Sequence, residues 1–277
     1  MEKKLRITIP SEIYKIIESD IIDFGITKNF LCNYIFENSE GFKSIYDYKY
    51  TGLKKIIQFN LNKKNLENYY NFLSEKKITV EAEYFRNIFL YYAQKSKKSR
   101  EQFIFKGIIN RILHAVENKK KIILTFTDET QKTISPYFIA CSELELKNYI
   151  FSYDDESKSF KNFSIRNIKS VYITEQTYYD KEMDFVQKIM ENFDPFLSYN
   201  KFLTVRLTDE GINLLETLKT YRPKIIEKKG NIYKFQCSIL QGKRYFSYFL
   251  NEAEILEPIE LREWFKKSFE KGIENYK

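Results

Sequence analysis

The segment from Lys4 to Ile9 alternates strictly between polar and apolar side chains. Successive side chains of a β-strand point to opposite faces, so this pattern predicts a strand with one buried face and one wet face. Such a strand must pack its apolar side against another element, which limits how the start of the chain can fold. The apolar set is Leu5, Ile7 and Ile9, and the polar set is Lys4, Arg6 and Thr8.

Two helices are predicted to follow this strand. Pro10 ends the strand, and Ser11 can cap a helix whose apolar positions keep helical spacing until Gly25. Thr27 can cap a second helix. The apolar stripe of that second helix comprises Phe30, Leu31, Tyr34 and Ile35.

A short basic strand followed by two helices resembles the ribbon-helix-helix module. In that family two copies pair their strands into an antiparallel ribbon that enters the major groove of DNA. Carried over to this chain, the resemblance implies that Lys4, Arg6 and Thr8 contact bases. Arg and Lys bind guanine edges, and Thr can bond a base or touch a thymine methyl. The alternative is an edge strand of a larger sheet.

The next segment repeats parts of this pattern. The stretch from Ile57 to Leu61 alternates as Leu5 to Ile9 does, and Ile78-Thr79 echoes Ile26-Thr27 at the same offset of 52 (57 − 5 and 78 − 26). The outward positions of this second strand would be Gln58 and Asn60. Either the chain builds a two-stranded ribbon from a tandem repeat, or residues 47–100 are a helical connector and the ribbon forms only in a homodimer.

Four short strand-like segments follow one another between Asn118 and Thr174. They are Lys121–Phe126, Ile134–Phe138, Lys147–Phe151 and Asn162–Val171. Their order resembles the WYL domain, a small Sm-like β-barrel found in bacterial nucleic-acid-responsive regulators. Ser135-Pro136-Tyr137 matches the family's proline-containing strand, and Tyr149 keeps the centre of its eponymous triplet.

The WYL resemblance implies a groove for a nucleotide or nucleic-acid ligand. Where family members commonly carry two arginines, this chain has Ser164 and Asn167, with Arg166 between them. By strand alternation Ser164 and Arg166 share one side, so Arg166 can partly replace the lost charge. The alternative is a packing barrel without a ligand. The candidate groove residues are Ser135, Tyr137, Tyr149, Lys161, Ser164 and Arg166.

The C-terminal part is predicted to be a strand at 201–207, a helix at 208–221, two or three strands within 224–250 and a helix at 259–275. This order resembles the extension that accompanies WYL domains, often called WCX, of ferredoxin-like form. Gln241-Gly-Lys-Arg244 is a candidate phosphate contact, and a hairpin turn is the preferred interpretation. The whole chain resembles ribbon-helix-helix–WYL proteins, some of which accompany type VI CRISPR effectors and bind single-stranded RNA.

No catalytic or metal-binding constellation is recognisable in the sequence. The only histidine, His114, falls on a predicted helix at 102–118, without an acid/base partner or metal-ligand spacing. The three cysteines follow no CxxC spacing. We therefore expect no enzyme activity, no metal and no cofactor. No signal peptide or membrane span is visible, so a cytoplasmic protein is expected.

The net charge of +8 and the pI of about 9.0 favour acidic partners, nucleic acid first among them.

The predicted class is α+β multidomain. Three functions remain open: a transcriptional regulator binding duplex DNA, a single-stranded RNA-binding accessory of a CRISPR effector, and a dimerisation scaffold. A homodimer is expected. The predicted domains are 1–46 (ribbon-helix-helix-like), 47–100 (helical or a second repeat), 101–178 (WYL-like), 179–199 (linker) and 200–277 (WCX-like).

Overall fold

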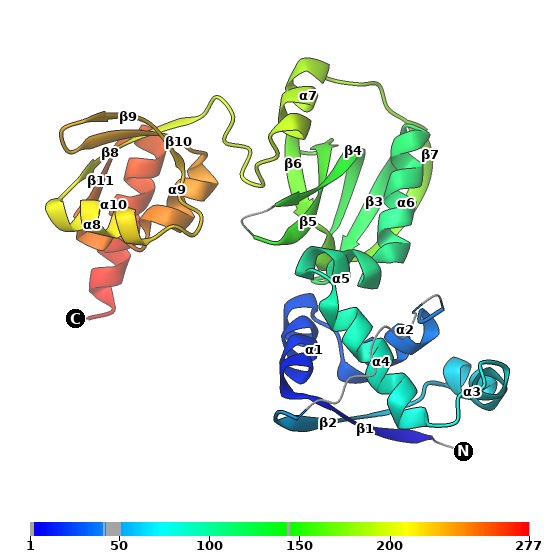
Figure 1. Cartoon of the computed structure of the whole chain (residues 1–277). Helices are drawn as coiled ribbons and strands as arrows, with labels where there is room; N and C mark the ends of the chain where they lie inside the picture. Colours follow the sequence, from blue (N-terminus) through cyan, green and yellow to red (C-terminus); the bar gives the residue numbers. More distant parts are fainter. Residues whose placement is uncertain (1–2, 41, 43–50, 143–144, 277) are drawn as a thin grey trace. The chain divides into compact units, whose positions relative to one another are not determined.

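A computed structural model describes residues 3–40, 42, 51–142 and 145–276 (Figure 1). The chain is mixed α+β and divides into two compact units. The first comprises Met1–Arg111 together with Ile165–Ser170, and the second comprises Ile112–Ser164 with Val171–Lys277. The predicted domain boundary at 46/47 lies outside the described residues.

The first unit contains a strand followed by two helices, twice over. The two strands pair antiparallel within the one chain, so the ribbon forms without a second copy. Figure 1 shows helices α1 and α4 over one face of this ribbon. The elements are β1 (Lys4–Pro10), α1 (Ser11–Phe24), α2 (Lys28–Glu37), β2 (Lys54–Asn60), α3 (Lys63–Glu75) and α4 (Glu81–Gln94).

The apolar face of the ribbon belongs to the core of this unit. Strand β1 shows the predicted alternation, and its apolar side chains are buried together with Ile57 and Phe59 of β2. Many aromatic rings complete this core, including Phe36, Phe85 and Phe89. Rings of this size supply large buried area, which favours a stable unit despite the many charged residues.

Two of the predicted helix ends in the first unit form at the expected residues, and one does not. The Thr27 side chain accepts a hydrogen bond from the Phe30 amide at 3.1 Å, and Gly25 adopts the left-handed conformation with φ of 63°. The predicted cap at Ser11 is wrong. Pro10 is the N-cap, and Ser11 is the first helical residue, whose amide donates to the Leu53 carbonyl at 2.9 Å. Pairing with the neighbouring strand end therefore replaces side-chain capping.

The predicted helix at 102–118 is wrong as a single element. The structure has α5 (Lys97–Ile104) and α6 (Lys106–Glu117), interrupted at Phe105. The Phe105 ring packs edge-on against Phe24, with ring centroids 6.1 Å apart. The partly buried Phe105 ring packs against the core of the first unit at this break, which helical spacing alone did not indicate.

A buried ion pair joins α1 to α5 in the first unit. The Arg100 guanidinium donates to both carboxylate oxygens of Asp20, at 2.6 and 3.0 Å. The Tyr92 hydroxyl donates to the same carboxylate at 2.7 Å. Asp20 is fully buried, so each of its hydrogen bonds compensates for lost hydration.

The second unit begins with a five-stranded sheet in the order β6-β5-β4-β3-β7. Helix α7 packs on it through Val186 and Ile189, which share a cluster with Tyr137 and Phe151. Residues 179–199 thus include a packed helix. The elements are β3 (Lys120–Phe126), β4 (Gln131–Ser142), β5 (Lys147–Asp154), β6 (Ser159–Ser164), β7 (Ile168–Thr177) and α7 (Met183–Glu191).

The remaining residues form a four-stranded sheet in the order β11-β8-β10-β9, with two helices inserted in the sequence β-α-β-β-α-β. The interpretation of Gln241–Arg244 as a hairpin turn is wrong, because it lies inside α9. A Cβ on Gly242 would lie 2.8 Å from the Leu261 side chain, so this glycine permits close packing. The elements are β8 (Phe202–Leu207), α8 (Asp209–Thr217), β9 (Lys224–Lys229), β10 (Ile232–Gln236), α9 (Ile239–Phe246), β11 (Ala253–Glu257) and α10 (Ile259–Glu274).

Across the described ranges, no helix combines the length and apolar character needed to cross a membrane.

The buried pair predicts a large effect of a shape-conserving substitution. Asp20→Asn leaves the Arg100 charge buried without a counter-charge, and we expect it to lower the free energy of unfolding by about 3–5 kcal/mol. Equilibrium urea unfolding would measure this loss. Glu67→Gln is the matched control: Glu67 is an exposed carboxylate, and its loss should stay within about 0.5 kcal/mol of the parent. Equal effects of the two substitutions would contradict the inference that the buried Arg100 charge depends on Asp20 as its counter-charge.

Candidate nucleic-acid interface

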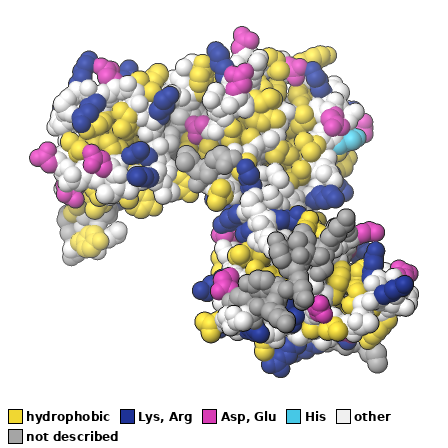
Figure 2. Space-filling model, viewed as in Figure 1, with side chains coloured by type: hydrophobic (Ala, Val, Ile, Leu, Met, Phe, Trp, Pro, Cys, Tyr) yellow, Lys and Arg dark blue, Asp and Glu magenta, His cyan; other side chains and the backbone are white. Residues whose placement is uncertain are grey.

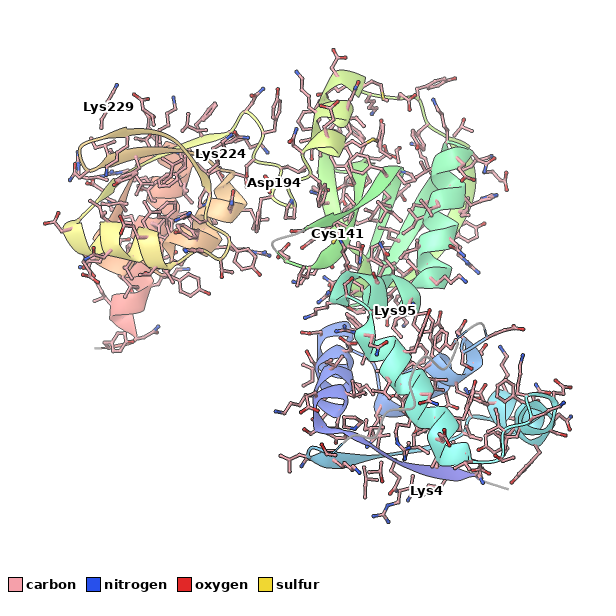
Figure 3. All side chains as sticks on the ribbon, in the orientation of Figure 1. Lys4, Lys95, Cys141, Asp194, Lys224 and Lys229 are labelled. Carbon is pink, nitrogen blue, oxygen red and sulfur yellow. The ribbon has the colours of Figure 1, made fainter. Side chains whose placement is uncertain are left out.

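The outward face of the β1–β2 ribbon brings together all five residues predicted to contact nucleic acid. Lys4 lies opposite Asn60, Arg6 opposite Gln58, and Thr8 opposite Ile56. Lys4, Arg6 and Thr8 are exposed, and Gln58 and Asn60 are partly exposed. In Figure 3, the labelled Lys4 lies on the side of the ribbon away from the helices.

The charge on this ribbon has one sign. Strands β1 and β2 contain Lys4, Arg6, Lys54 and Lys55, and neither strand contains an Asp or Glu. Lys54 and Lys55 are exposed at the end of the ribbon opposite Lys4. Figure 2 shows Lys and Arg side chains at the lower margin of the first unit, where Figure 1 labels the ribbon. A two-stranded ribbon fits the major groove, and such a face would favour phosphates around it.

Side chains from the second helix of each repeat hold the ribbon from behind. The Arg86 Nε on α4 donates to the Thr8 carbonyl at 3.0 Å. The Asn33 Nδ2 on α2 donates to the Asn60 carbonyl at 2.9 Å. Each repeat's second helix therefore binds the strand of the other repeat. These bonds fix the strand ends without using their outward side chains.

Asn33 is the centre of a buried amide network. Its Oδ1 accepts from the Asn62 amide at 2.8 Å and from the Asn65 Nδ2 at 2.9 Å. The Asn62 side chain in turn caps α3 by accepting from the Asn65 amide at 2.8 Å. The network links α2, the end of β2 and the start of α3. The network thereby holds the Asn60 end of strand β2 against helix α2.

Five of the six candidates for a WYL-type groove belong to the second unit, where they differ in burial and in partners. Tyr137 is buried; its hydroxyl accepts from the Lys181 amide at 2.9 Å, and its ring packs on Phe151 and Phe160. Ser135 is buried within β4. These positions are part of the packing of the second unit.

Two further candidates lie opposite each other on neighbouring strands. Tyr149 of β5 pairs in register with Ser164 of β6, and the Tyr149 hydroxyl donates to Glu145. The Ser164 hydroxyl is buried and has no hydrogen-bond partner among the residues that the structure describes. This pair is the part of the predicted groove that the strand register brings together.

The Lys161 ammonium contacts the buried Asp154 carboxylate, with Nζ 2.6 Å from Oδ2. Burial alone would raise the pKa of Asp154. The hydrogen bonds from Lys161 and Ser157 outweigh burial and hold that pKa below its usual value. The positive charge of Lys161 is therefore committed to an internal carboxylate.

The prediction that Arg166 shares a strand face with Ser164 is wrong. Strand β6 ends at Ser164, and Ile165–Asn167 form a 3₁₀ turn. Arg166 belongs to the first unit, where its Nε donates to the fully buried Glu101 carboxylate at 2.7 Å. Its guanidinium also lies over the Phe24 ring, 5.3 Å from the centroid. Arg166 anchors this turn by ion pairing.

Sequence reasoning missed several residues of the ribbon site. Ile56 and Lys54 occupy every second position before Gln58 and Asn60, so they belong to the same face of the strand. Extending the alternation back to residue 54 would have identified them. The anchoring roles of Asn33 and Arg86 leave no local signal. Their partners lie 27 and 78 residues away in the chain.

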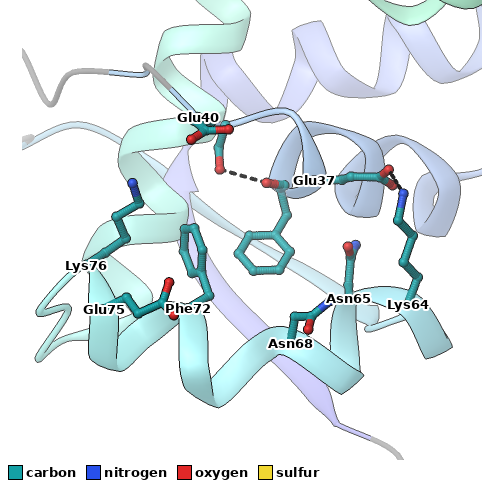
Figure 4. Close-up of a pocket in the computed structure, with 10 residues that line it drawn as sticks. Glu37, Glu40, Lys64, Asn65, Asn68, Phe72, Glu75 and Lys76 are labelled. Carbon is teal, nitrogen blue, oxygen red and sulfur yellow. Dashed lines mark hydrogen bonds and ion pairs between the residues drawn. The ribbon is translucent and has the colours of Figure 1, made fainter.

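The first unit also has a hollow of about 290 Å³ between the end of α2 and α3 (Figure 4). Acidic and basic side chains alternate around it: Glu37 pairs with Lys64, and Glu40, Glu75 and Lys76 also line it. The Ser39 hydroxyl donates to the Phe36 carbonyl at 2.7 Å. The described lining of this hollow therefore offers carboxylates and ammonium groups side by side.

Cysteine and metal chemistry have little support in the described part of the chain. Burial raises the pKa of Cys32 and of Cys237 to about 12, so neither is a thiolate near neutral pH. Among the residues described, no group of three or more His, Cys, Asp or Glu side chains could hold a metal ion.

Comparison with known proteins gives a structural relationship but no sequence family. No protein-family model and no curated protein sequence matches the chain. A solved structure described as "Crystal structure of a CRISPR Cas-related protein" is similar over 100% of this chain and 94% of that chain, with a TM-score of 0.68 and 16% identity. At this identity the likeness shows a shared fold.

Proteasome accessory factor B/C (PafBC) of Arthrobacter aurescens also matches, at 15% identity over 59% of this chain and 26% of that chain. Its TM-score of 0.30 is too low to support an argument.

The Lys161–Asp154 contact predicts a pH-dependent stability. A carboxylate whose pKa is lowered on folding stabilises the fold above its unfolded pKa, and that contribution is lost as the pH falls through the folded pKa. Lys161→Met should therefore cost about 1 kcal/mol at pH 7, a value reduced by the partial exposure of Lys161. Urea unfolding between pH 7 and pH 2 should show this difference shrink as Asp154 protonates.

Lys158→Met is the control, because Lys158 is an exposed lysine in the same hairpin. A Lys161→Met effect that is constant over this pH range would contradict the assignment.

Proposed function

We propose that this chain is a nucleic-acid-binding regulatory protein whose β1–β2 ribbon enters the major groove of duplex DNA, in the manner of a ribbon-helix-helix module. The observation that carries the proposal is the ribbon's outward face. It presents Lys4, Arg6, Thr8, Gln58 and Asn60 together, over a rigid apolar inner face. Arg and Lys suit guanine edges, and Gln and Asn suit adenine edges.

The proposal describes a transcriptional regulator and a binding role without catalysis. The WYL-like region would tune DNA affinity by binding a nucleotide or nucleic-acid ligand, with Tyr149 and the buried Ser164 hydroxyl as the supporting pair. A homodimer remains a prediction from the resemblance, although one chain already supplies both strands of the ribbon.

A second candidate function is an RNA-binding accessory role beside a CRISPR effector. The fold shared with a CRISPR Cas-related protein favours it, and so does a feature of the four-stranded sheet. Phe202 of β8 is 47% exposed, and the Lys234 ammonium of β10 lies 5.0 Å from its ring centroid. An exposed ring beside a cation can stack a base and contact its phosphate.

Duplex binding tests the first function. Arg6→Ala should weaken binding of a cognate duplex by about 1–3 kcal/mol, because it removes a bidentate contact to a base. Fluorescence anisotropy across a salt series would measure the affinity and its salt dependence. Lys266→Ala removes an exposed lysine of α10 and should leave affinity nearly unchanged. Absence of duplex binding by the parent protein at low salt would exclude this function.

Binding to single-stranded RNA tests the second function. Phe202→Ala should weaken it by about 1–3 kcal/mol if a base stacks on this ring. Tyr248→Ala is a suitable control, because Tyr248 is an exposed aromatic residue outside the sheet. If the parent and Phe202→Ala bind RNA with equal affinity, the four-stranded sheet does not bind an RNA base through this ring. A chain that binds neither nucleic acid would be left as a scaffold for protein interactions.

A further inference from the structure

The strand register places a pseudo-two-fold axis at one residue pair of the ribbon. The two repeats are offset by 52 residues, so Arg6 is equivalent to Gln58 (58 − 6 = 52). Arg6 and Gln58 also lie directly opposite each other. Equivalent residues that face each other mark the axis of a symmetric ribbon.

The side chains related by this axis are chemically different. Lys4 is equivalent to Ile56, and Thr8 is equivalent to Asn60, by the same offset. A ribbon built from two identical chains would present the same side chains on both halves. Here each outward position is occupied by a different type of residue in the two repeats.

The two ends of the ribbon therefore present different chemistry. At one end Lys4 lies opposite Asn60, which offers an ammonium and an amide. At the other end Thr8 lies opposite Ile56, and the Ile56 side chain is 45% exposed on an otherwise polar face. Lys and Asn suit purine edges, whereas apolar groups and the Thr methyl suit the thymine methyl.

The second helices of the two repeats, α2 and α4, differ in the charge at their starts as well. Helix α2 begins with Lys28 after the Thr27 cap. Helix α4 begins after Val80, with Glu81 and Glu83 in its first turn, and of these Glu81 is ion-paired with Lys3. Phosphates are favoured by cations and repelled by carboxylates near a helix start, so the backbone contacts of the two repeats would be unequal.

We infer that the ribbon binds a non-palindromic duplex sequence as a single chain. Lys4 and Asn60 contact purines at one end, Arg6 and Gln58 contact the centre, and Ile56 with Thr8 contacts thymine methyl groups at the other end. Ile56 is thus a specificity-determining residue. The inference rests on the proposed duplex binding and adds the polarity of the target and the chemistry of each end.

Selection from a random duplex library with the full-length chain tests the polarity. The expected consensus has no inverted repeat and carries thymine at one end only. An inverted-repeat consensus would overturn the inference while leaving duplex binding intact, and so would binding without sequence preference. Failure of the chain to bind any duplex at low salt would instead show that the proposed function itself is wrong.

Replacing thymine by deoxyuridine in the selected sequence tests Ile56 directly, because only the 5-methyl group is removed. The parent protein should lose affinity about fourfold on this replacement, as expected for one buried methyl. Ile56→Ala should show a smaller difference between the two duplexes, and the remainder would come from the Thr8 methyl group. Ile22→Ala removes a side chain that is 80% exposed on α1 and should stay as sensitive as the parent.

Retention of the parent's fourfold sensitivity in Ile56→Ala would overturn the role of this residue. Loss of sensitivity in Ile22→Ala as well would also overturn it, because the effect would then not be specific to the ribbon.

Discussion

Backbone pairing between β1 and β2 joins two segments whose facing residues Arg6 and Gln58 are 52 positions apart (58 − 6). The register is specified by the apolar inner face, where Leu5 lies opposite Phe59 and Ile7 opposite Ile57. A slip of one residue would turn these side chains outward and bury the cations. Burial of this face thus determines which side chains the ribbon presents, and the proposed interface depends on it.

Hydrogen bonds and a buried ion pair supplement this apolar burial in the first unit. Arg86 and Asn33 hold the strand ends through backbone carbonyls, and Asp20 with Arg100 ties α1 to α5. A buried pair of this kind contributes little net stability, but removing one partner is costly. These contacts therefore favour one arrangement of the helices over others. These contacts hold the strand backbone and leave the outward side chains of the ribbon exposed.

The region predicted to resemble a WYL domain differs from the N-terminal ribbon in the partners of its cations. Arg166 is paired with Glu101, and Lys161 is paired with Asp154. Both partners are fully buried carboxylates. The ribbon's Lys4 and Arg6 are instead exposed on a strand without acidic residues. Charge available for a nucleic acid is therefore better supported on the ribbon than at the groove that the resemblance implied.

Much of the local structure was predictable from the sequence. Alternation identified the strands that became β1 and β2 and assigned their outward residues, because side-chain period follows directly from strand geometry. Gly25 and Thr27 marked helix ends through backbone conformation and capping. The break at Phe105 and the helical environment of Gly242 were not predicted, and both residues contact side chains far away in the sequence, which local patterns do not encode.

The sequence by itself therefore determined the ribbon's two faces and left a tandem repeat and a helical connector as alternatives for residues 47–100. Only the tertiary structure decided that the strands pair within one chain and that Arg166 is committed to Glu101. It also decided that Ile56 shares an exposed face with Thr8. Periodicity is a property of neighbouring residues, whereas pairing, ion-pair partners and exposure depend on contacts between segments far apart in the chain.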